Sequence, residues 1–269
     1  MLLTVDVGNT NITFGVYDGE TVLTTFRMMS QTNKTSDEFG ISILNLLEAN
    51  GIARQGIGGI IVVSVVPGIM HALVGALIRY VGRRPYIIGH GVKTGIEIAT
   101  DNPREVGTDR IVDAAAAYTL YGGPVMVLDF GTATTYDVVD EKGQFISGVT
   151  APGIGISAKA LWQNTAKLPE IEIKKPASIL AKETISSMQA GLVYGQIGQA
   201  KYIIEETKKA LDYPNMKVVA TGGLGRMIAD ELPEIDVYDA TLTLKGLQII
   251  YEMNRDTAPQ ENPYESGRE

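Results

Sequence analysis

The stretch Asp6-Val7-Gly8-Asn9-Thr10-Asn11 decides the fold, because a similar one recurs at Asp129-Phe130-Gly131-Thr132-Ala133-Thr134-Thr135. Each stretch follows a short apolar run that is typical of a buried strand. After each come a second strand, a turn rich in glycine and charged residues, and a third strand. Because the same pattern occurs twice, about half a chain apart, the sequence predicts two lobes that share one architecture.

Outside these repeats, the pattern of apolar residues alternates between strand and helix. Strands are predicted at 2–7, 12–16, 22–28, 60–66, 125–128, 136–139, 144–149 and 218–220. Helices are predicted from the capping box of Thr35 and Glu38 to Gly51, after Pro67, over 178–211, from Gly225, and over 242–254. Alternating strands and helices predict an α/β fold with mixed sheets flanked by helices.

The composition limits the class of protein. A chain of 269 residues is long enough for two lobes, and we place them at 1–120 and 121–254, with a flexible tail at 255–269. The net charge of −8 argues against nucleic acid as the main partner. No apolar run reaches the ~20 residues of a membrane span, so we expect a cytoplasmic protein with no membrane partner. The absence of cysteine excludes disulfides and a cysteine nucleophile.

The first repeat has the chemistry of a phosphate-binding turn. Gly8 allows a tight turn that brings backbone N–H groups, Asn9 and Thr10 towards an anion. At the end of a strand, the carboxylate of Asp6 could hold a metal directly or through water. An ordinary hairpin with Asn and Thr in its turn is the alternative interpretation.

The second repeat and a third glycine turn strengthen the first interpretation. Asp129 and Thr132 occupy the corresponding positions of the second repeat, and Thr221-Gly222-Gly223 follows another strand. Together the three motifs resemble the two phosphate motifs and the adenosine motif of the actin/hexokinase/Hsp70 superfamily. The resemblance implies duplicated actin-like (ribonuclease H-like) lobes with an ATP cleft between them.

A closer resemblance lies in the segment Asp101-Asn102-Pro103-Arg104-Glu105-Val106-Gly107-Thr108-Asp109-Arg110 and in Ala151-Pro152-Gly153. With the phosphate motifs, these segments resemble the type III pantothenate kinases from the first strand to the last helix. The resemblance implies phosphorylation of pantothenate by ATP, the first step of coenzyme A synthesis. It also implies Mg²⁺, a monovalent cation (K⁺ or NH₄⁺), and a homodimer whose substrate site is shared between subunits.

The resemblance implies roles for specific residues. Asp109 matches the catalytic base, Asp129 the potassium ligand, and Thr184 a pantothenate contact that serves the neighbouring subunit's site. The pantothenate loop is Gly107, Thr108, Asp109 and Arg110. The implied ATP contacts are Asp6, Val7, Gly8, Asn9, Thr10, Asn11, Ile12, Thr13, Thr132, Gly222 and Gly223, with Asp6 also near the metal. Thr100 departs from the family, since some members carry a tyrosine there.

The chemistry of Asp109 and Arg110 agrees with this assignment independently. Phosphoryl transfer to an alcohol needs a carboxylate near the hydroxyl and N–H or cationic groups around the transferred oxygens. The alternative is that Asp109 caps a helix and Arg110 is solvated on its first turn. His71 and His90 lack metal-ligand spacing, so structural roles are expected.

Two other classes of protein stay open. A sugar kinase or an exopolyphosphatase-like relative would share the nucleotide motifs but lack the segment 105–110. A regulator of the same fold would keep the core and lose the base or a phosphate loop.

Overall fold

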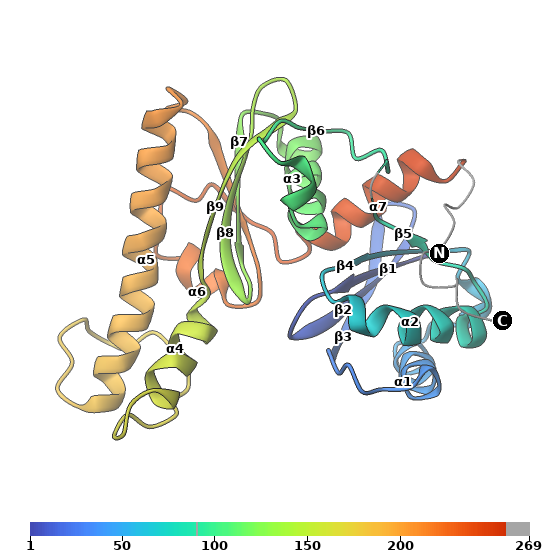
Figure 1. Ribbon diagram of the computed structural model, residues 1–269, viewed down its shortest axis with the longest axis horizontal. Coiled ribbons are helices and arrows are strands. Elements are labelled where there is room, and N and C mark those ends of the chain that lie inside the picture. The colour runs from blue at the N-terminus through green and yellow to red at the C-terminus, as the bar shows by residue number, and fades with distance from the viewer. Residues whose placement is uncertain (90, 257–269) are drawn as a thin grey trace. The chain divides into compact units, whose positions relative to one another are not determined.

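The computed structural model describes residues 1–89 and 91–256, and its elements are shown in Figure 1. His90 and most of the predicted tail lie outside the described residues. The backbone contacts divide the chain into two compact units. The first unit contains residues 1–95, 104–116 and the chain from 243, and the second contains residues 96–103 and 117–242. The predicted lobes of 1–120 and 121–254 stay predictions, as does the cleft between them.

The first unit is built on a five-stranded mixed sheet with the order β3-β2-β1-β4-β5. Its strands are β1 (Leu2–Val7), β2 (Asn11–Asp18), β3 (Thr21–Met29), β4 (Gly59–Ser64) and β5 (Tyr86–Ile87). β1 to β3, the three strands predicted around the first repeat, form an antiparallel meander, whereas β4 and β5 continue the sheet in parallel. The run at 60–66 ends as a strand at Ser64, two residues earlier than predicted.

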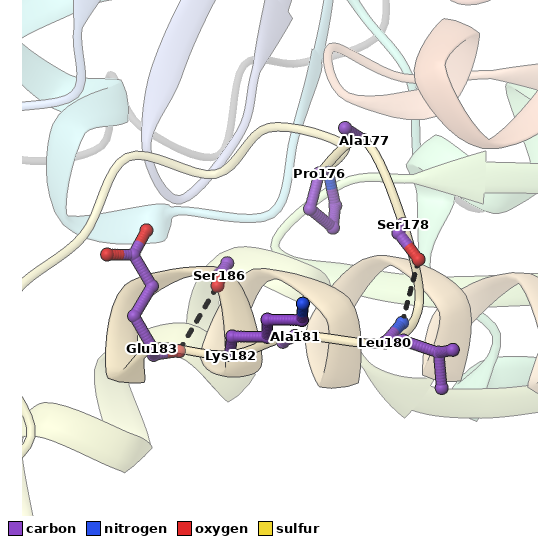
Figure 2. A pocket seen from close by; sticks show the side chains of 8 residues that line it. All are labelled: Pro176, Ala177, Ser178, Leu180, Ala181, Lys182, Glu183 and Ser186. Carbon is purple, nitrogen blue, oxygen red and sulfur yellow. Dashed lines mark hydrogen bonds between the residues drawn. The ribbon is translucent and has the colours of Figure 1, made fainter.

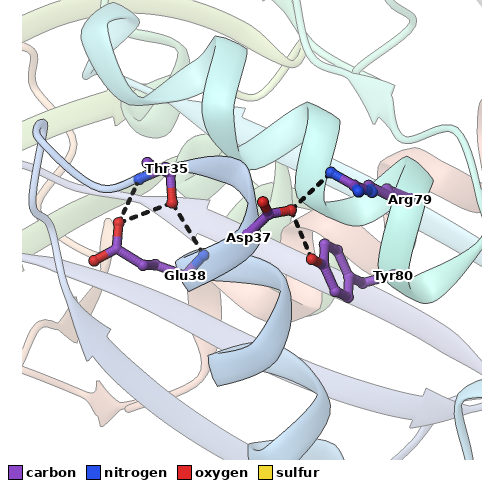
Figure 3. A network of polar contacts seen from close by, with 5 residues as sticks. All are labelled: Thr35, Asp37, Glu38, Arg79 and Tyr80. Carbon is purple, nitrogen blue, oxygen red and sulfur yellow. Dashed lines mark hydrogen bonds and ion pairs between the residues drawn. The ribbon is translucent and has the colours of Figure 1, made fainter.

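Two helices cover one face of this sheet, α1 (Ser36–Ala49) and α2 (Pro67–Ala76). The capping box predicted for Thr35 and Glu38 is present, and both of its hydrogen bonds form. Next to it, Asp37 accepts hydrogen bonds from Arg79 at 2.8 Å and Tyr80 at 2.6 Å, as Figure 3 shows. Arg79 and Tyr80 belong to the π-helical turn Leu77–Val81 that follows α2, so this network ties the start of α1 to that turn.

The last helix, α7 (Leu242–Asn254), packs on the other face of the first sheet. A methyl group at Gly15 would lie 2.7 Å from the hydroxyl of Thr4 and 3.1 Å from the side chain of Leu244. Since Leu3, Val5 and Val7 join the core formed with α1 and α2, the alternation of the strand puts Thr4 and Asp6 on the α7 face. This face is where the polar residues of β1 lie.

Asn254 fastens the end of α7 to the segment after β5. It is 3% exposed, and its amide nitrogen donates to the backbone oxygens of Lys93 at 2.8 Å and Ile250 at 2.7 Å. Its side-chain oxygen accepts from the Lys93 N–H at 3.2 Å and from the hydroxyl of Tyr86 at 3.3 Å. All of its hydrogen-bonding capacity is thus used within the first unit.

The second unit is built on a six-stranded mixed sheet with the order β11-β10-β7-β8-β9-β6. Its strands are β6 (Glu97–Ile98), β7 (Val125–Phe130), β8 (Ala133–Val139), β9 (Gln144–Pro152), β10 (Lys217–Thr221) and β11 (Val237–Tyr238). Without β6 and starting from the opposite edge, the order β9-β8-β7-β10-β11 corresponds to β3-β2-β1-β4-β5 of the first sheet. In both sheets the first three strands are antiparallel and the last two continue in parallel. The duplicated α/β architecture predicted from the sequence is therefore confirmed.

Three helices pack on one face of the second sheet: α4 (Ile154–Gln163), α5 (Thr184–Ala210) and α6 (Gly225–Ala229). The prediction of one helix over 178–211 was wrong at its start. Residues 178–183 lie before α5, in a segment where Ser178 accepts a hydrogen bond from the Leu180 N–H at 3.0 Å. This local bond offers the backbone an alternative to the helix.

The helix α3 (Thr108–Tyr121) runs from the first unit into the second. Its first half packs closely on α7, since a methyl group at Gly246 would lie 2.5 Å from the backbone oxygen of Val112. Its last residue, Tyr121, donates a hydrogen bond at 2.9 Å to Asp239. Among the described residues, no helix is both long and apolar enough to cross a membrane.

Candidate active site

In the first unit, the predicted phosphate turn is closed by its own backbone. The N–H of Gly8 donates to the oxygen of Asn11 at 3.0 Å, and residues 9–11 are exposed. Ser30 fastens both sides of the turn: its N–H donates to the oxygen of Thr10 at 3.0 Å, and its hydroxyl donates to the oxygen of Gly8 at 2.5 Å. The sequence analysis missed Ser30, and nothing in its local pattern distinguishes it from an ordinary serine after a strand.

The start of α3 lies at the same end of the first sheet as this turn. The hydroxyl of Thr108 donates to the oxygen of Ser64 at 3.3 Å, at the end of β4. β4 pairs with β1, with Ser64 opposite Val7 and Val63 opposite Asp6. The structure therefore brings the helix start that carries Asp109 to the carboxyl ends of β1 and β4, where Asp6 and the Gly8 turn lie.

Asp109 is the second residue of α3, half-buried, and its carboxylate accepts the backbone N–H of Arg110 at 2.8 Å. Because the helix begins at Thr108, Asp109 is not its N-cap residue, although its carboxylate does accept one of the first-turn N–H groups. A methyl group at Gly107 would lie 2.6 Å from the Asp109 carboxylate, so any side chain at position 107 would displace this carboxylate. Its negative charge in the first turn is stabilised by the helix dipole.

In the second unit, Asp129 lies next to last in β7, as Asp6 does in β1. The two strands have the same sequence of buried and half-buried residues. Met126, Leu128 and Phe130 join the core on the helical face, so Asp129 points to the other face. Its strand neighbours are Thr135 on β8 and Thr221 on β10.

The turns on either side of Asp129 pack closely against its carboxylate. Gly222 adopts a φ of 96°, and a methyl group there would lie 2.6 Å from Oδ1 of Asp129. A methyl group at Gly131 would lie 3.1 Å from Oδ2. The structure therefore brings Asp129 together with two of the glycine turns that the sequence singled out.

Thr132 and Gly153 form the edge of this region. The N–H of Gly153 donates to the backbone oxygen of Thr132 at 3.1 Å, and a side chain at Gly153 would collide with the oxygens of Gly131 and Thr132. Backbone carbonyl oxygens thus gather on the chain next to Asp129, the hard ligands that alkali cations prefer. In the described parts of the chain, no three His, Asp or Glu side chains cluster as a metal site.

Thr184 begins α5 and is exposed, in a pocket of the second unit with a volume of about 570 Å³. The same pocket includes Ser157 of α4, whose N–H donates to the oxygen of Gly153 at 3.0 Å. The pocket is therefore one helical turn away from the Thr132–Gly153 contact. A second pocket, of about 400 Å³, lies between the segment before α5 and its first turn; Figure 2 shows Pro176, Lys182 and Ser186 on its walls.

The residues predicted to bind ATP, metal ions and pantothenate therefore fall into two groups. The Asp6–Thr13 segment and the Gly107–Arg110 loop lie at the same end of the first sheet, while Asp129, Thr132, Gly222, Gly223 and Thr184 belong to the second unit. Thr100 also lies in the second unit, and its hydroxyl oxygen is buried without a hydrogen-bond partner among the described residues. His71 is exposed on α2.

The fold has relatives among solved structures. A protein that carries the name of a 2-dehydro-3-deoxygalactonokinase, from Sinorhizobium meliloti, is 16% identical with a TM-score of 0.61, over 98% of this chain and 99% of that one. The ethanolamine utilization protein EutJ from Carboxydothermus hydrogenoformans is 17% identical with a TM-score of 0.54, over 92% and 89% of the two chains. At such identity these similarities establish only that the chain shares the fold of these two proteins.

Sequence comparison identifies the family. The type III pantothenate kinase of Agathobacter rectalis is 59% identical over 93% of this chain and 96% of its own length. That of Listeria welshimeri is 49% identical over 96% and 99%. The family profile described as type III pantothenate kinase matches residues 2–206. The chain belongs to the type III pantothenate kinase family, as the motifs indicated.

Proposed function

We propose that the protein transfers the γ-phosphoryl group of ATP to the 4′-hydroxyl of pantothenate, giving 4′-phosphopantothenate and ADP in the first step of coenzyme A synthesis. The observation that carries this proposal is the position of Asp109 on a helix start fastened through Thr108 to the end of β4. This is the end of the sheet at which the Gly8 turn leaves β1.

Asp109 is the proposed general base. As the 4′-oxygen attacks the γ-phosphorus, its proton passes to the Asp109 carboxylate, and the bond to the β-phosphate oxygen breaks. Arg110 and the backbone N–H groups of the Gly8 turn would stabilise the charge on the phosphoryl oxygens. Mg²⁺ would neutralise the phosphates, with Asp6 as a ligand directly or through water.

The test of Asp109 is replacement by asparagine, which preserves shape and removes basicity. Turnover of pantothenate should fall by roughly 10²- to 10⁴-fold, the usual contribution of a general base. Asp18→Asn, at the exposed last residue of β2 in the same unit, is the matched control and should leave turnover unchanged. An Asp109→Asn enzyme with near wild-type turnover would refute the assignment.

A substrate panel tests the reaction itself. ADP formation from ATP should depend on pantothenate and should not be supported by a panel of sugars. Phosphorylation of a sugar in place of pantothenate would favour the sugar-kinase alternative. If the protein bound the nucleotide but formed no ADP with any substrate, a regulator of the same fold would be favoured.

We further propose a monovalent cation, K⁺ or NH₄⁺, at Asp129. The carboxylate, together with the backbone oxygens of Gly131 and Thr132 that crowd Gly153, supports this proposal, since all are hard oxygen ligands. The cation would screen Asp129 from the triphosphate. Activity should rise steeply when K⁺ replaces Na⁺ at constant ionic strength, and equal activity in both salts would exclude a selective site.

The functional unit that we propose is a two-fold homodimer in which Thr184 serves the partner's pantothenate site. In support, Thr184 is exposed beside a pocket, and apolar side chains near it are also exposed: Ile156 by 47%, Ile185 by 48% and Leu180 by 80%. Exposed apolar side chains gathered in this way are typical of protein interfaces. A monomer would then lack a complete site.

Mixed dimers test the shared site. Thr184→Arg should raise the KM for pantothenate more than that for ATP, because it adds bulk and charge in the proposed substrate pocket. Mixing it with Asp109→Asn should restore part of the activity, since one site of each heterodimer keeps both native residues. The shared site would be disproved if fully exchanged heterodimers of two folded parents regained nothing, or if the active species sedimented as a monomer.

A further inference from the structure

A tyrosine outside all of the sequence motifs contacts the third glycine turn of the second unit. Tyr238 ends β11, opposite Ala220 of β10, and its hydroxyl donates to the backbone oxygen of Gly222 at 2.7 Å. This distance is that of a strong O–H···O hydrogen bond. The turn that begins at Gly222 is therefore held by a side chain from the neighbouring strand.

The oxygen of Gly222 has a second donor, the N–H of Gly225 at 3.1 Å. Two donors satisfy both lone pairs of this carbonyl, so the peptide plane between Gly222 and Gly223 has a fixed orientation. In a trans peptide the C=O and the N–H point in opposite directions. The N–H of Gly223, which is an exposed residue, is therefore directed away from Tyr238.

The ring of Tyr238 is itself held in place on two sides. The guanidinium carbon of Arg226 lies 4.6 Å from the ring centroid, within the range of a cation–π contact. A methyl group at Gly225 would lie 2.9 Å from the rings of both Tyr238 and Phe130. The position of the hydroxyl is therefore set by packing before any ligand binds.

On its other side, the same turn lies against Asp129. Gly222 has the φ of 96° that favours glycine, and a methyl group there would lie 2.6 Å from the Asp129 carboxylate. Without the Tyr238 hydroxyl, one of the two bonds that fix the Gly222 carbonyl is lost. A peptide between two glycines then has the freedom to rotate.

We propose that Tyr238 is a positioning residue for the nucleotide: its hydroxyl fixes the Gly222–Gly223 peptide so that the Gly223 N–H is preset to donate to ATP. This inference rests on the proposed role of Gly222 and Gly223 as ATP contacts. Tyr238 acts through the turn. A preset donor spares the nucleotide the entropic cost of ordering the turn on binding.

Tyr238→Phe tests the proposal, because it keeps the ring and its contacts with Arg226 and Gly225 and removes only the hydroxyl. The KM for ATP should rise about 3- to 10-fold, the range expected from the loss of one hydrogen bond. The KM for pantothenate and kcat should stay within about twofold. Tyr118→Phe is the matched control, since the Tyr118 hydroxyl also donates to a backbone oxygen in the second unit, that of Glu141 at 3.4 Å.

Calorimetric binding of a non-hydrolysable ATP analogue separates this inference from the proposed reaction. A weaker analogue affinity in Tyr238→Phe, with Tyr118→Phe unchanged, supports it even if pantothenate is not the substrate. Equal affinity of wild type and Tyr238→Phe overturns it. An equal rise in the KM values for ATP and pantothenate, with a lower melting temperature, would show a general structural role for Tyr238 and would also overturn the inference. A wild-type protein that binds no nucleotide would overturn the inference together with the proposed reaction.

Discussion

Replacing Gly246 by alanine measures how closely α7 must approach α3, the helix that begins next to Asp109. Two effects of opposite sign compete. Gly246 lies inside α7, where alanine is favoured over glycine by about 1 kcal/mol because it restricts the unfolded chain. Against this, the new methyl group would lie 2.5 Å from the Val112 oxygen and 3.1 Å from the Ala116 methyl group.

The steric effect should be the larger. An ordinary contact between a methyl carbon and an oxygen is well beyond 3 Å, and the oxygen belongs to a helical backbone that cannot rotate away. The helices would have to separate, at a cost of about 1–3 kcal/mol for an overpacked core. After subtraction of the helix-propensity gain, we expect Gly246→Ala to destabilise the protein by up to about 2 kcal/mol. For a chain of this size the melting temperature should fall by several degrees.

Gly198 provides the matched control, because it also lies inside a helix, α5, and a methyl group there would meet nothing within 4 Å. Gly198→Ala should therefore raise the melting temperature while Gly246→Ala lowers it, as followed by circular dichroism. If Gly246→Ala were as stable as Gly198→Ala, the reasoning from close packing would be refuted.

Three further variants test separate features. Asp6→Asn should raise the Mg²⁺ concentration needed for half-maximal activity, because one carboxylate leaves the proposed metal site, and an unchanged Mg²⁺ dependence would argue against that role. Asn254→Ala should lower the free energy of unfolding by about 1–3 kcal/mol in urea titrations, since the buried Asn254 side chain loses its hydrogen bonds with the backbone N–H and oxygen of Lys93; a loss below about 0.5 kcal/mol would contradict this. Burial, and then the hydrogen bond to Asp239, raises the pKa of Tyr121 to about 12, so its contribution to stability is present below pH 10 and is lost as the pH rises towards 12. The melting temperature of Tyr121→Phe should accordingly fall less than that of the wild type as the pH rises from 10 to 12. If the two melting temperatures fell in parallel with pH, this contribution of Tyr121 would be excluded.

The duplicated sheets could be predicted from the sequence because strand order follows from local pattern and chain connectivity. The run before Asp6 and the run before Asp129 have the same apolar pattern and the same kind of turn, and both proved to be central strands. The start of α5 could not be predicted, because residues 178–183 include apolar residues at positions compatible with a helix. The hydrogen bond that the Ser178 side chain accepts from the Leu180 N–H, together with the exposure of Leu180, decides that segment instead.

The candidate site was predictable where a glycine is needed to leave room for a neighbouring carboxylate. Gly107 and Gly222 both lie against carboxylates, and motifs of this kind are visible in sequence. Ser30 and Tyr238 were missed because they act through hydrogen bonds to backbone oxygens far from them along the chain. Such a bond depends on strand pairing between segments far apart in the chain, and no local pattern records it.

The division of the chain between the units has a consequence for its synthesis on the ribosome. The first unit needs α7, whose side chains pack on Gly15, Gly59 and Gly95, but α7 is translated after every strand of both sheets. The second unit needs only 96–103 and 117–242. We therefore expect the middle of the chain to fold first during translation, while the N-terminal sheet waits, with the face that α7 covers still open, for the last helix to emerge.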